Sequence, residues 1–306
     1  MKQNKRETCG YTLNGVCIQV HNGMNDTGGV SDAITVLDGV SYIHERMCDL
    51  EFRVSLHSFF QVNVMAAERL YDLVANFIAC QSRVTLFGKS FLSGYTFICC
   101  HKKIWKCCCY YICCGTGGIG LCIAKKAYPH VTKLIGLEIV EDAVKDAKFN
   151  AELNGITTAE FIAGPAEKTL TDVLTRLNEE NNTEDKVAIV NPPRSGLHSS
   201  VLHRLRDEDI DKIVYVSCNP KSCMSDVLRL CLPLSSRQSG IPFKPVYAVA
   251  CDLFPHTEHV EMVVCLVKCS DEDLDWCKLK ETGKFKKSRF IQNKIQEAIQ
   301  KEAKSI

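Results

Sequence analysis

Residues 110–120 read YYICCGTGGIG, an apolar run that meets a glycine-rich turn and continues into an apolar segment with helical spacing. The same order of strand, turn and helix recurs downstream, which is typical of a mostly parallel sheet with helices on both faces. Apolar runs predict strands at residues 110–114, 134–138, 159–162, 187–190, 213–217, 246–250 and 260–267. Apolar periodicity predicts helices between them at residues 119–127, 141–153, 169–177, 200–205 and 223–230. We therefore predict an α/β fold.

The rest of the chain differs from this pattern. Residues 1–62 are rich in short strand candidates separated by Gly, Asn and Asp, and residues 66–80 have the periodicity of an amphipathic helix. Residues 83–109 contain many cysteines and have no clean period, so we interpret them as an atypical insertion. We expect three regions: a β-rich N-terminal remnant over 1–62, the main α/β domain over 63–269 and a basic tail over 270–306.

Composition limits the class of protein. The formal net charge of the 306 residues is +1, so overall charge does not indicate a polyanionic partner. The 19 cysteines are odd in number and irregularly spaced, and no signal peptide precedes them, which favours reduced thiols in the cytoplasm or nucleus. Adjacent cysteines do not form paired C-x-x-C motifs, so we expect no metal site. No apolar run reaches the ~18 residues of a membrane span.

The tail contains the strongest local charge. Residues 278–306 hold nine Lys or Arg against three Glu, with a weak helical stripe of apolar residues. A solvated terminal helix is the simpler interpretation, and contact with RNA phosphates is the alternative.

An acidic residue stands about 20 residues after the glycine turn, at the end of the next predicted strand. Glycines at 115, 117, 118 and 120 let a ligand approach the backbone closely, and the next predicted strand ends in Glu138, which is positioned to bind ribose hydroxyls. A plain turn is the alternative for the glycines alone. The spacing differs from G-x-G-x-x-G and no Walker lysine is present, so S-adenosylmethionine suits the site better than NAD or ATP.

Cys218 stands at the end of an apolar strand, and Asn219-Pro220 then turns the chain. A buried structural thiol is the default alternative. The C5 atom of a pyrimidine is a poor nucleophile, but thiolate addition at C6 makes it one, and a base must afterwards remove the C5 proton. Glu258 and Glu261 are both available as that base, with His256 and His259 beside them.

Residues 191–194, Asn-Pro-Pro-Arg, end another predicted strand. Methyltransferases that act on exocyclic amines often carry Asn-Pro-Pro followed by an aromatic residue. Arg194 in the fourth position makes amine methylation less favoured, and a loop stiffened by proline remains an alternative.

Five motifs together resemble the RNA (uracil-5-)-methyltransferases over residues 39–268: SFFQVN at 58–63, CCGTGGIGL at 113–121, NPPRSGLH at 191–198, VYVSCNP at 214–220 and DLFPHTEHVE at 252–261. The resemblance implies a class I (Rossmann-like) S-adenosylmethionine-dependent methyltransferase domain over 63–269, which makes 5-methyluridine in the T-loop of tRNA. It implies that Cys218 is the nucleophile and Glu261 the base. The implied S-adenosylmethionine contacts are Gln61, Gly115, Gly117, Glu138 and Asn191.

The chain also departs from that family. The position of Asn191 is more often Asp, so one acceptor loses its charge, and the segment 83–109 replaces a shorter connection. By this resemblance we expect the chain to correspond to the C-terminal part of such an enzyme, without the N-terminal RNA-recognition domain of eukaryotic relatives. Two other hypotheses follow: a non-catalytic RNA-binding relative, and an amino-group methyltransferase built on Asn-Pro-Pro. The first depends on whether residues 112–114 form the central strand beside residues 134–138.

Overall fold

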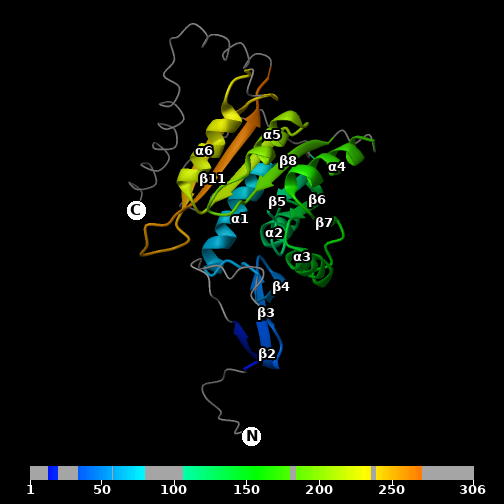
Figure 1. Ribbon diagram of the computed structural model, residues 1–306, viewed down its shortest axis with the longest axis vertical. Coiled ribbons are helices and arrows are strands. Elements are labelled where there is room, and N and C mark those ends of the chain that lie inside the picture. Colours follow the sequence, from blue (N-terminus) through cyan, green and yellow to red (C-terminus); the bar gives the residue numbers. More distant parts are fainter. Residues whose placement is uncertain are drawn as a thin grey trace, which may run out of the picture.

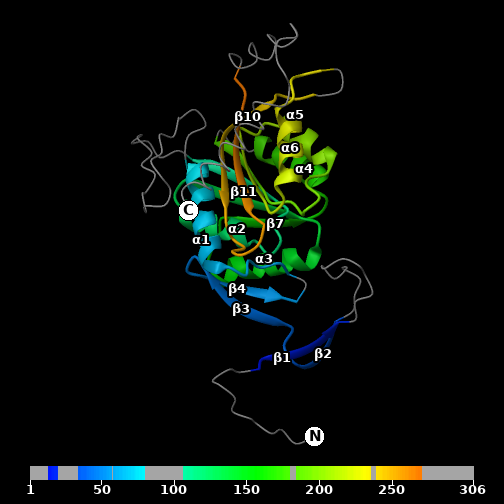
Figure 2. The same ribbon diagram turned by 90° about the vertical axis from the view of Figure 1, so that its left-hand side faces the viewer.

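The computed structural model describes residues 13–19, 34–56, 58–79, 106–179, 184–235 and 239–270. A large sheet flanked by helices forms most of the molecule, and the N-terminal strands lie beyond one end of it (Figures 1 and 2). The N-terminal strands are β1 (Gly15–Gln19), β2 (Ile34–Gly39), β3 (Tyr42–Met47) and β4 (Leu50–Ser55). The strands of the sheet are β5 (Cys107–Ile112), β6 (Val131–Glu138), β7 (Ala159–Ala163), β8 (Asp185–Val190), β9 (Lys212–Ser217), β10 (Phe243–Cys251) and β11 (Glu261–Lys268).

The seven strands follow the order β10-β11-β9-β8-β5-β6-β7. Strands β5 to β9 are parallel, β11 is antiparallel to β9, and β10 is antiparallel to β11. Helices α1 (Val64–Ala79), α2 (Gly118–Lys126) and α3 (Glu141–Leu153) share the core of one face. Helices α4 (Ala166–Glu179), α5 (Ser199–Asp207) and α6 (Pro220–Cys231) share the core of the other. The predicted α/β fold of the class I methyltransferase type is therefore confirmed.

Strand β5 begins earlier than the sequence indicated. We expected a strand over 110–114 after an irregular insertion, but Cys107, Cys108 and Cys109 already pair with β6 and β8. Every residue of β5 is buried, with Cys107, Cys109 and Tyr111 in one core and Cys108, Tyr110 and Ile112 in the other. A parallel strand buried on both faces shows no polar–apolar alternation, so its period gave no signal. The strand lies in the middle of the five parallel strands, between β8 and β6, and it ends at Ile112, so that Cys113 and Cys114 belong to the turn that follows.

The N-terminal strands form two hairpin pairs, β1 with β2 and β3 with β4. Parts of three expected features lie outside the described residues: the β-rich N-terminal segment, the Cys-rich segment up to residue 105, and the basic tail from residue 271. Among the helices that the structure describes, none is long and apolar enough to cross a membrane.

Candidate active site

The glycine turn and Glu138 lie together where β5 and β6 end. One carboxylate oxygen of Glu138 accepts the N–H of Gly115 at 2.9 Å, and the other accepts the N–H groups of Ile139 and Val140 at 2.9 and 3.1 Å. Gly115 has a φ of 53°, and a Cβ added there or at Gly118 would meet no atom within 4 Å. Open space therefore lies over the turn, as close approach of a ligand to the backbone requires.

A cavity of about 520 Å³ opens beside this turn. Its walls come from the carboxyl ends of neighbouring strands, where open α/β sheets bind ligands. The lining residues are Cys113, Leu137, Glu138, Ile139, Gly164, Pro165, Ala166, Glu167, Pro193, Ser195, Gly196, Leu197, His198 and Val201. The lining is mostly apolar, has two carboxylates and contains neither Lys nor Arg. The negative charge there would repel a phosphate group, would attract a sulfonium cation and would not oppose an uncharged adenosine.

The other two residues expected to contact a cofactor occupy nearby segments. Asn191 follows β8; its N–H donates to the Ile112 carbonyl at 3.2 Å, and its side chain lies close enough to Tyr111 to oppose the rise in the pKa of that hydroxyl on burial. Gln61 is buried between β4 and α1. Two residues later the side chain of Asn63 donates to the Leu253 carbonyl at 3.1 Å, so this segment lies against the loop that leads to Glu261.

Sheet register places Glu261 beside Cys218. Strands β9 and β11 are antiparallel, with Met262 opposite Ser217, so the next residue pair along the ladder is Glu261 and Cys218. Asn219 caps helix α6 and also donates from its side chain to the Arg194 carbonyl at 2.8 Å. The thiol, the carboxylate and the 191–198 loop consequently meet at one edge of the sheet.

Arg194 is a residue whose role the sequence did not reveal. Its guanidinium lies close enough to Cys218 to lower the pKa of the thiol, while Pro193 and Ser195 on either side of it line the cavity. A buried carboxylate, Asp226, holds this loop in place by accepting the Leu197 N–H at 2.7 Å and the Tyr215 hydroxyl at 2.6 Å. The Asn-Pro-Pro-Arg pattern marked the loop as important, but only the fold brings its arginine to the thiol.

Burial shifts the titration of both reactive groups. Burial raises the pKa of the Glu261 carboxyl from 4.5 to about 7, and no described residue makes an ion pair or hydrogen bond with it. Burial and the Glu261 charge raise the pKa of the Cys218 thiol, and Arg194 opposes both effects by hydrogen bonding and by its charge. A buried, unpaired carboxyl that titrates near neutrality is typical of a catalytic base.

The Glu261 pKa predicts a pH-dependent cost in stability. At a pH below 4.5 the carboxyl is protonated whether the chain is folded or unfolded, and as pH rises to about 7 ionisation favours the unfolded state. We expect Glu261→Gln to gain free energy of unfolding relative to the wild type by roughly 2–3 kcal/mol between pH 5 and pH 8. Denaturant titrations at several pH values measure this. For Glu258→Gln, the difference in free energy of unfolding from the wild type should not change with pH. The same result for Glu261→Gln would contradict the shifted pKa.

Glu258 is exposed and precedes β11, in the loop over residues 252–260. In a continuous strand, residues three apart face opposite ways, so Glu258 would point away from a thiol that Glu261 faces. It is indeed exposed, but the reason is that the strand begins only at Glu261. In the residues that the structure describes, no three His, Cys, Asp or Glu side chains are grouped as metal ligands.

Known proteins resemble this chain in structure and in sequence. The crystal structure of Pyrococcus abyssi tRNA (uracil-54, C5)-methyltransferase in complex with S-adenosyl-L-homocysteine matches with a TM-score of 0.55 at 26% identity, over 84% of this chain and 52% of that one. The human tRNA (uracil-5-)-methyltransferase homolog A is 40% identical over 223 residues, which is 72% of this chain and 31% of the relative. The homolog B of Danio rerio is 39% identical over 75% of this chain and 42% of its own length.

The chain therefore spans a third to a half of the length of these relatives. The family model for tRNA (uracil-5-)-methyltransferases matches residues 106–269. That match begins at the strand that carries the cysteine run, includes Cys218 and Glu261, and covers more than half of the 306 residues. On this evidence the chain belongs to the tRNA (uracil-5-)-methyltransferase family.

Proposed function

We propose that this chain methylates C5 of uridine in tRNA, giving 5-methyluridine in the T-loop, with S-adenosylmethionine as the methyl donor. The observation that carries the proposal is the grouping of Cys218, Arg194 and Glu261 beside the cavity at the carboxyl ends of the strands. A thiol and a buried carboxyl are the two groups that C5 methylation of a pyrimidine requires.

The residues around the cavity fit S-adenosylmethionine. Three backbone N–H groups already bind Glu138, and its carboxylate has a further acceptor site for a ribose hydroxyl. The side chain of Ile139 is 68% exposed and lines the cavity, so it offers an apolar surface to adenine. Gly115 leaves the backbone of the turn open, whereas Gly117 packs against Phe161 and Leu121 and shapes the turn from below. Gln61 and Asn191 would supply amides to the cofactor. The bound cofactor supplies an electrophilic methyl group.

Cys218 begins the reaction. Its thiolate adds to C6 of the uracil ring, and the electrons of the C5–C6 double bond move onto the C4 carbonyl as an enolate. The enolate makes C5 nucleophilic toward the methyl group that S-adenosylmethionine, held by Glu138 and the glycine turn, would supply, with S-adenosylhomocysteine as the leaving group. Arg194 assists the first step because its positive charge beside the sulfur favours the thiolate.

Glu261 ends the reaction. Its carboxylate takes the proton from C5, the C5–H electron pair re-forms the C5–C6 double bond, and the bond from C6 to the Cys218 sulfur breaks. The thiolate is regenerated and the proton is released later to solvent. A base with a pKa of about 7 is ionised in a large share of molecules at neutral pH, and it binds the proton firmly enough to remove it.

Methyl transfer to tRNA tests the proposal directly. The purified chain is incubated with unmodified tRNA and S-adenosylmethionine labelled in the methyl group, and the nucleosides are then analysed. We expect label in 5-methyluridine from the T-loop. Label in a methylated amine nucleoside would favour the amino-group alternative, and no label with any tRNA would favour a non-catalytic RNA-binding relative. The pairing of β5 with β6 and β8, in the middle of the five parallel strands, supports the catalytic proposal over the latter.

Glu138 gives a prediction for the cofactor site. Glu138→Ala removes the acceptor for the ribose and also the acceptor for the Gly115 N–H, so we expect S-adenosylmethionine binding to weaken by ~1–3 kcal/mol. Titration calorimetry measures the change. Glu167→Ala is the matched control, because this second carboxylate of the cavity has no described bond to the glycine turn. Unchanged affinity in the Glu138 variant would make Glu138 a structural acid only.

A further inference from the structure

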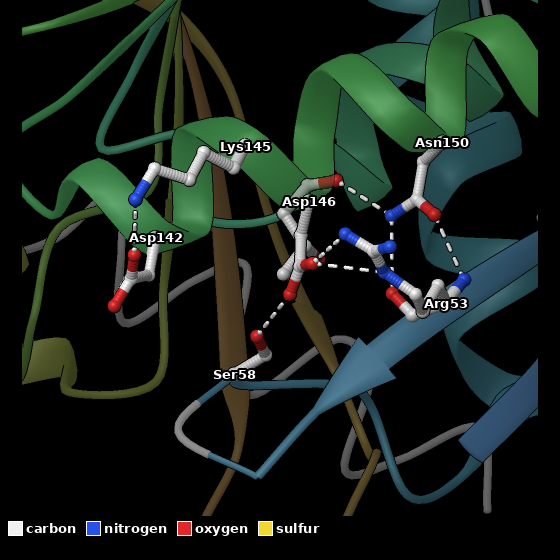
Figure 3. A network of polar contacts seen from close by, with 7 residues as sticks. Arg53, Ser58, Asp142, Lys145, Asp146 and Asn150 are labelled. Carbon is white, nitrogen blue, oxygen red and sulfur yellow. Dashed lines mark hydrogen bonds and ion pairs between the residues drawn. The ribbon is translucent and has the colours of Figure 1, made fainter. Parts of the chain in front are cut away.

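A polar network joins helix α3 to strand β4 and to the segment before Gln61 (Figure 3). At its centre the Asp146 carboxylate is 3% exposed. One of its oxygens accepts hydrogen bonds from Nε and Nη2 of Arg53 at 3.1 and 2.6 Å, and the other accepts one from the Ser58 hydroxyl at 3.0 Å. The Arg53 guanidinium also lies over the Phe149 ring, 3.9 Å from its centroid. Asp146 thereby ties the chain entering the Gln61 segment to α3.

Asn150, one turn further along α3, reaches the glycine turn. Its side chain is fully buried, and its amide nitrogen donates to the Thr116 carbonyl and to the Arg53 carbonyl, both at 3.2 Å. Its amide oxygen accepts the Arg53 N–H at 2.8 Å. Thr116 stands between Gly115 and Gly117, so this bond fixes the middle of a turn whose flanking residues have left-handed φ values of 53° and 83°.

From one helix the network thus contacts both the glycine turn, at Thr116, and the segment before Gln61, at Ser58. Glycine residues have wide backbone freedom, and no atom lies within 4 Å of a Cβ added at Gly115 or Gly118. The conformation of the turn therefore depends on the hydrogen bonds that its backbone makes to the protein beneath it. Asn150 holds the carbonyl of the turn, and Asp146 holds the hydroxyl three residues before Gln61. Neither side chain lines the cavity.

We propose that Asn150 and Asp146 are positioning residues of the cofactor site, which fix the glycine turn and the Gln61 segment in a binding arrangement. The inference rests on the proposed function, since it assumes that S-adenosylmethionine binds between these two segments. On this proposal the buried polar side chains of α3 contribute to cofactor affinity as well as to stability. Loss of Asn150 would let the glycine turn move, and loss of Asp146 would let the Gln61 segment move.

Binding of S-adenosylhomocysteine to the full chain tests the assignment. We expect Asn150→Ala and Ser58→Ala each to weaken binding, by roughly tenfold for Asn150→Ala and by less for Ser58→Ala. Activity assays should show a higher KM for S-adenosylmethionine with kcat nearly unchanged at saturation. Hydrogen exchange should become faster at the amides of residues 115–118 in Asn150→Ala.

Lys145→Ala is the matched control, because Lys145 lies on the same helix but forms only an exposed ion pair with Asp142 at 2.8 Å (Figure 3). It should bind and exchange as the wild type does. A folded Asn150→Ala protein with wild-type affinity and wild-type exchange overturns the proposal for Asn150. Where Asn150→Ala does not fold, Ser58→Ala decides, since it deletes one hydroxyl from a half-buried position. Failure of the wild type itself to bind would instead refute the proposed function.

Discussion

Cys218→Ala should abolish methyl transfer to tRNA, with a loss on the order of 10⁴-fold or more, while S-adenosylmethionine still binds. Alanine cannot add to C6, so C5 stays a poor nucleophile and the barrier to methylation is that of the unactivated ring. Cofactor binding should survive because the thiol does not line the cavity beside Glu138. Nucleoside analysis measures the first effect, and calorimetry measures the second.

Trapping the adduct makes this prediction specific to the covalent mechanism. The wild type should form a denaturant-stable complex with tRNA that carries 5-fluorouridine, because fluorine cannot leave C5 as a proton does. Cys218→Ala should form none. Cys223→Ala is the matched control: burial raises the pKa of that thiol to about 12, so it supplies almost no thiolate at neutral pH. Loss of cofactor binding in a folded Cys218→Ala protein would place the residue in a different site.

Glu261→Gln should accumulate a methylated RNA–protein adduct and slow product release by roughly 10²–10⁴-fold. The amide cannot accept the C5 proton, so the final elimination stops, whereas thiol addition and methyl transfer need no base at this position. The adduct should survive denaturing gel electrophoresis and carry the label from S-adenosylmethionine. The double variant Cys218→Ala, Glu261→Gln should carry none, which would locate the bond.

Glu258→Gln serves as the control for the carboxylate assignment and should turn over almost normally, since Glu258 is exposed in the loop before β11. Release of methylated RNA by Glu261→Gln at the wild-type rate would mean that another group removes the proton. The stability measurement on the same variant is independent of catalysis. A variant that is more stable at pH 8 and yet blocked at elimination would show that the buried carboxyl is kept at the expense of folding free energy.

The cysteine run before the glycine turn marks the limit of sequence reasoning on this chain. Residues 107–109 have neither the alternation of a half-buried strand nor the charges of a loop. They are a strand because β6 and β8 supply backbone partners on both sides and helices cover both faces. Local composition cannot report those partners, since they lie some 25 to 80 residues away along the chain.

The sequence by itself determined the alternation of strands and helices, the glycine turn followed by Glu138, and the position of Cys218 at a strand end. These features depend on periodicity and on contacts between near neighbours, which the order of residues records directly. It also marked Asn191 and Gln61 through a family resemblance, and their contacts with a cofactor stay predictions.

Only the tertiary structure decided which groups act together. The antiparallel register of β9 and β11 sets Glu261 next to Cys218, and burial there raises the pKa of its carboxyl to about 7. The turn after Cys218 brings the 191–198 loop close enough for Arg194 to reach the sulfur. Helix α3 likewise joins Arg53 to Asp146 across 93 residues of sequence. Such contacts form between distant parts of the chain, and their energies depend on burial, which exists only once the sheet has assembled.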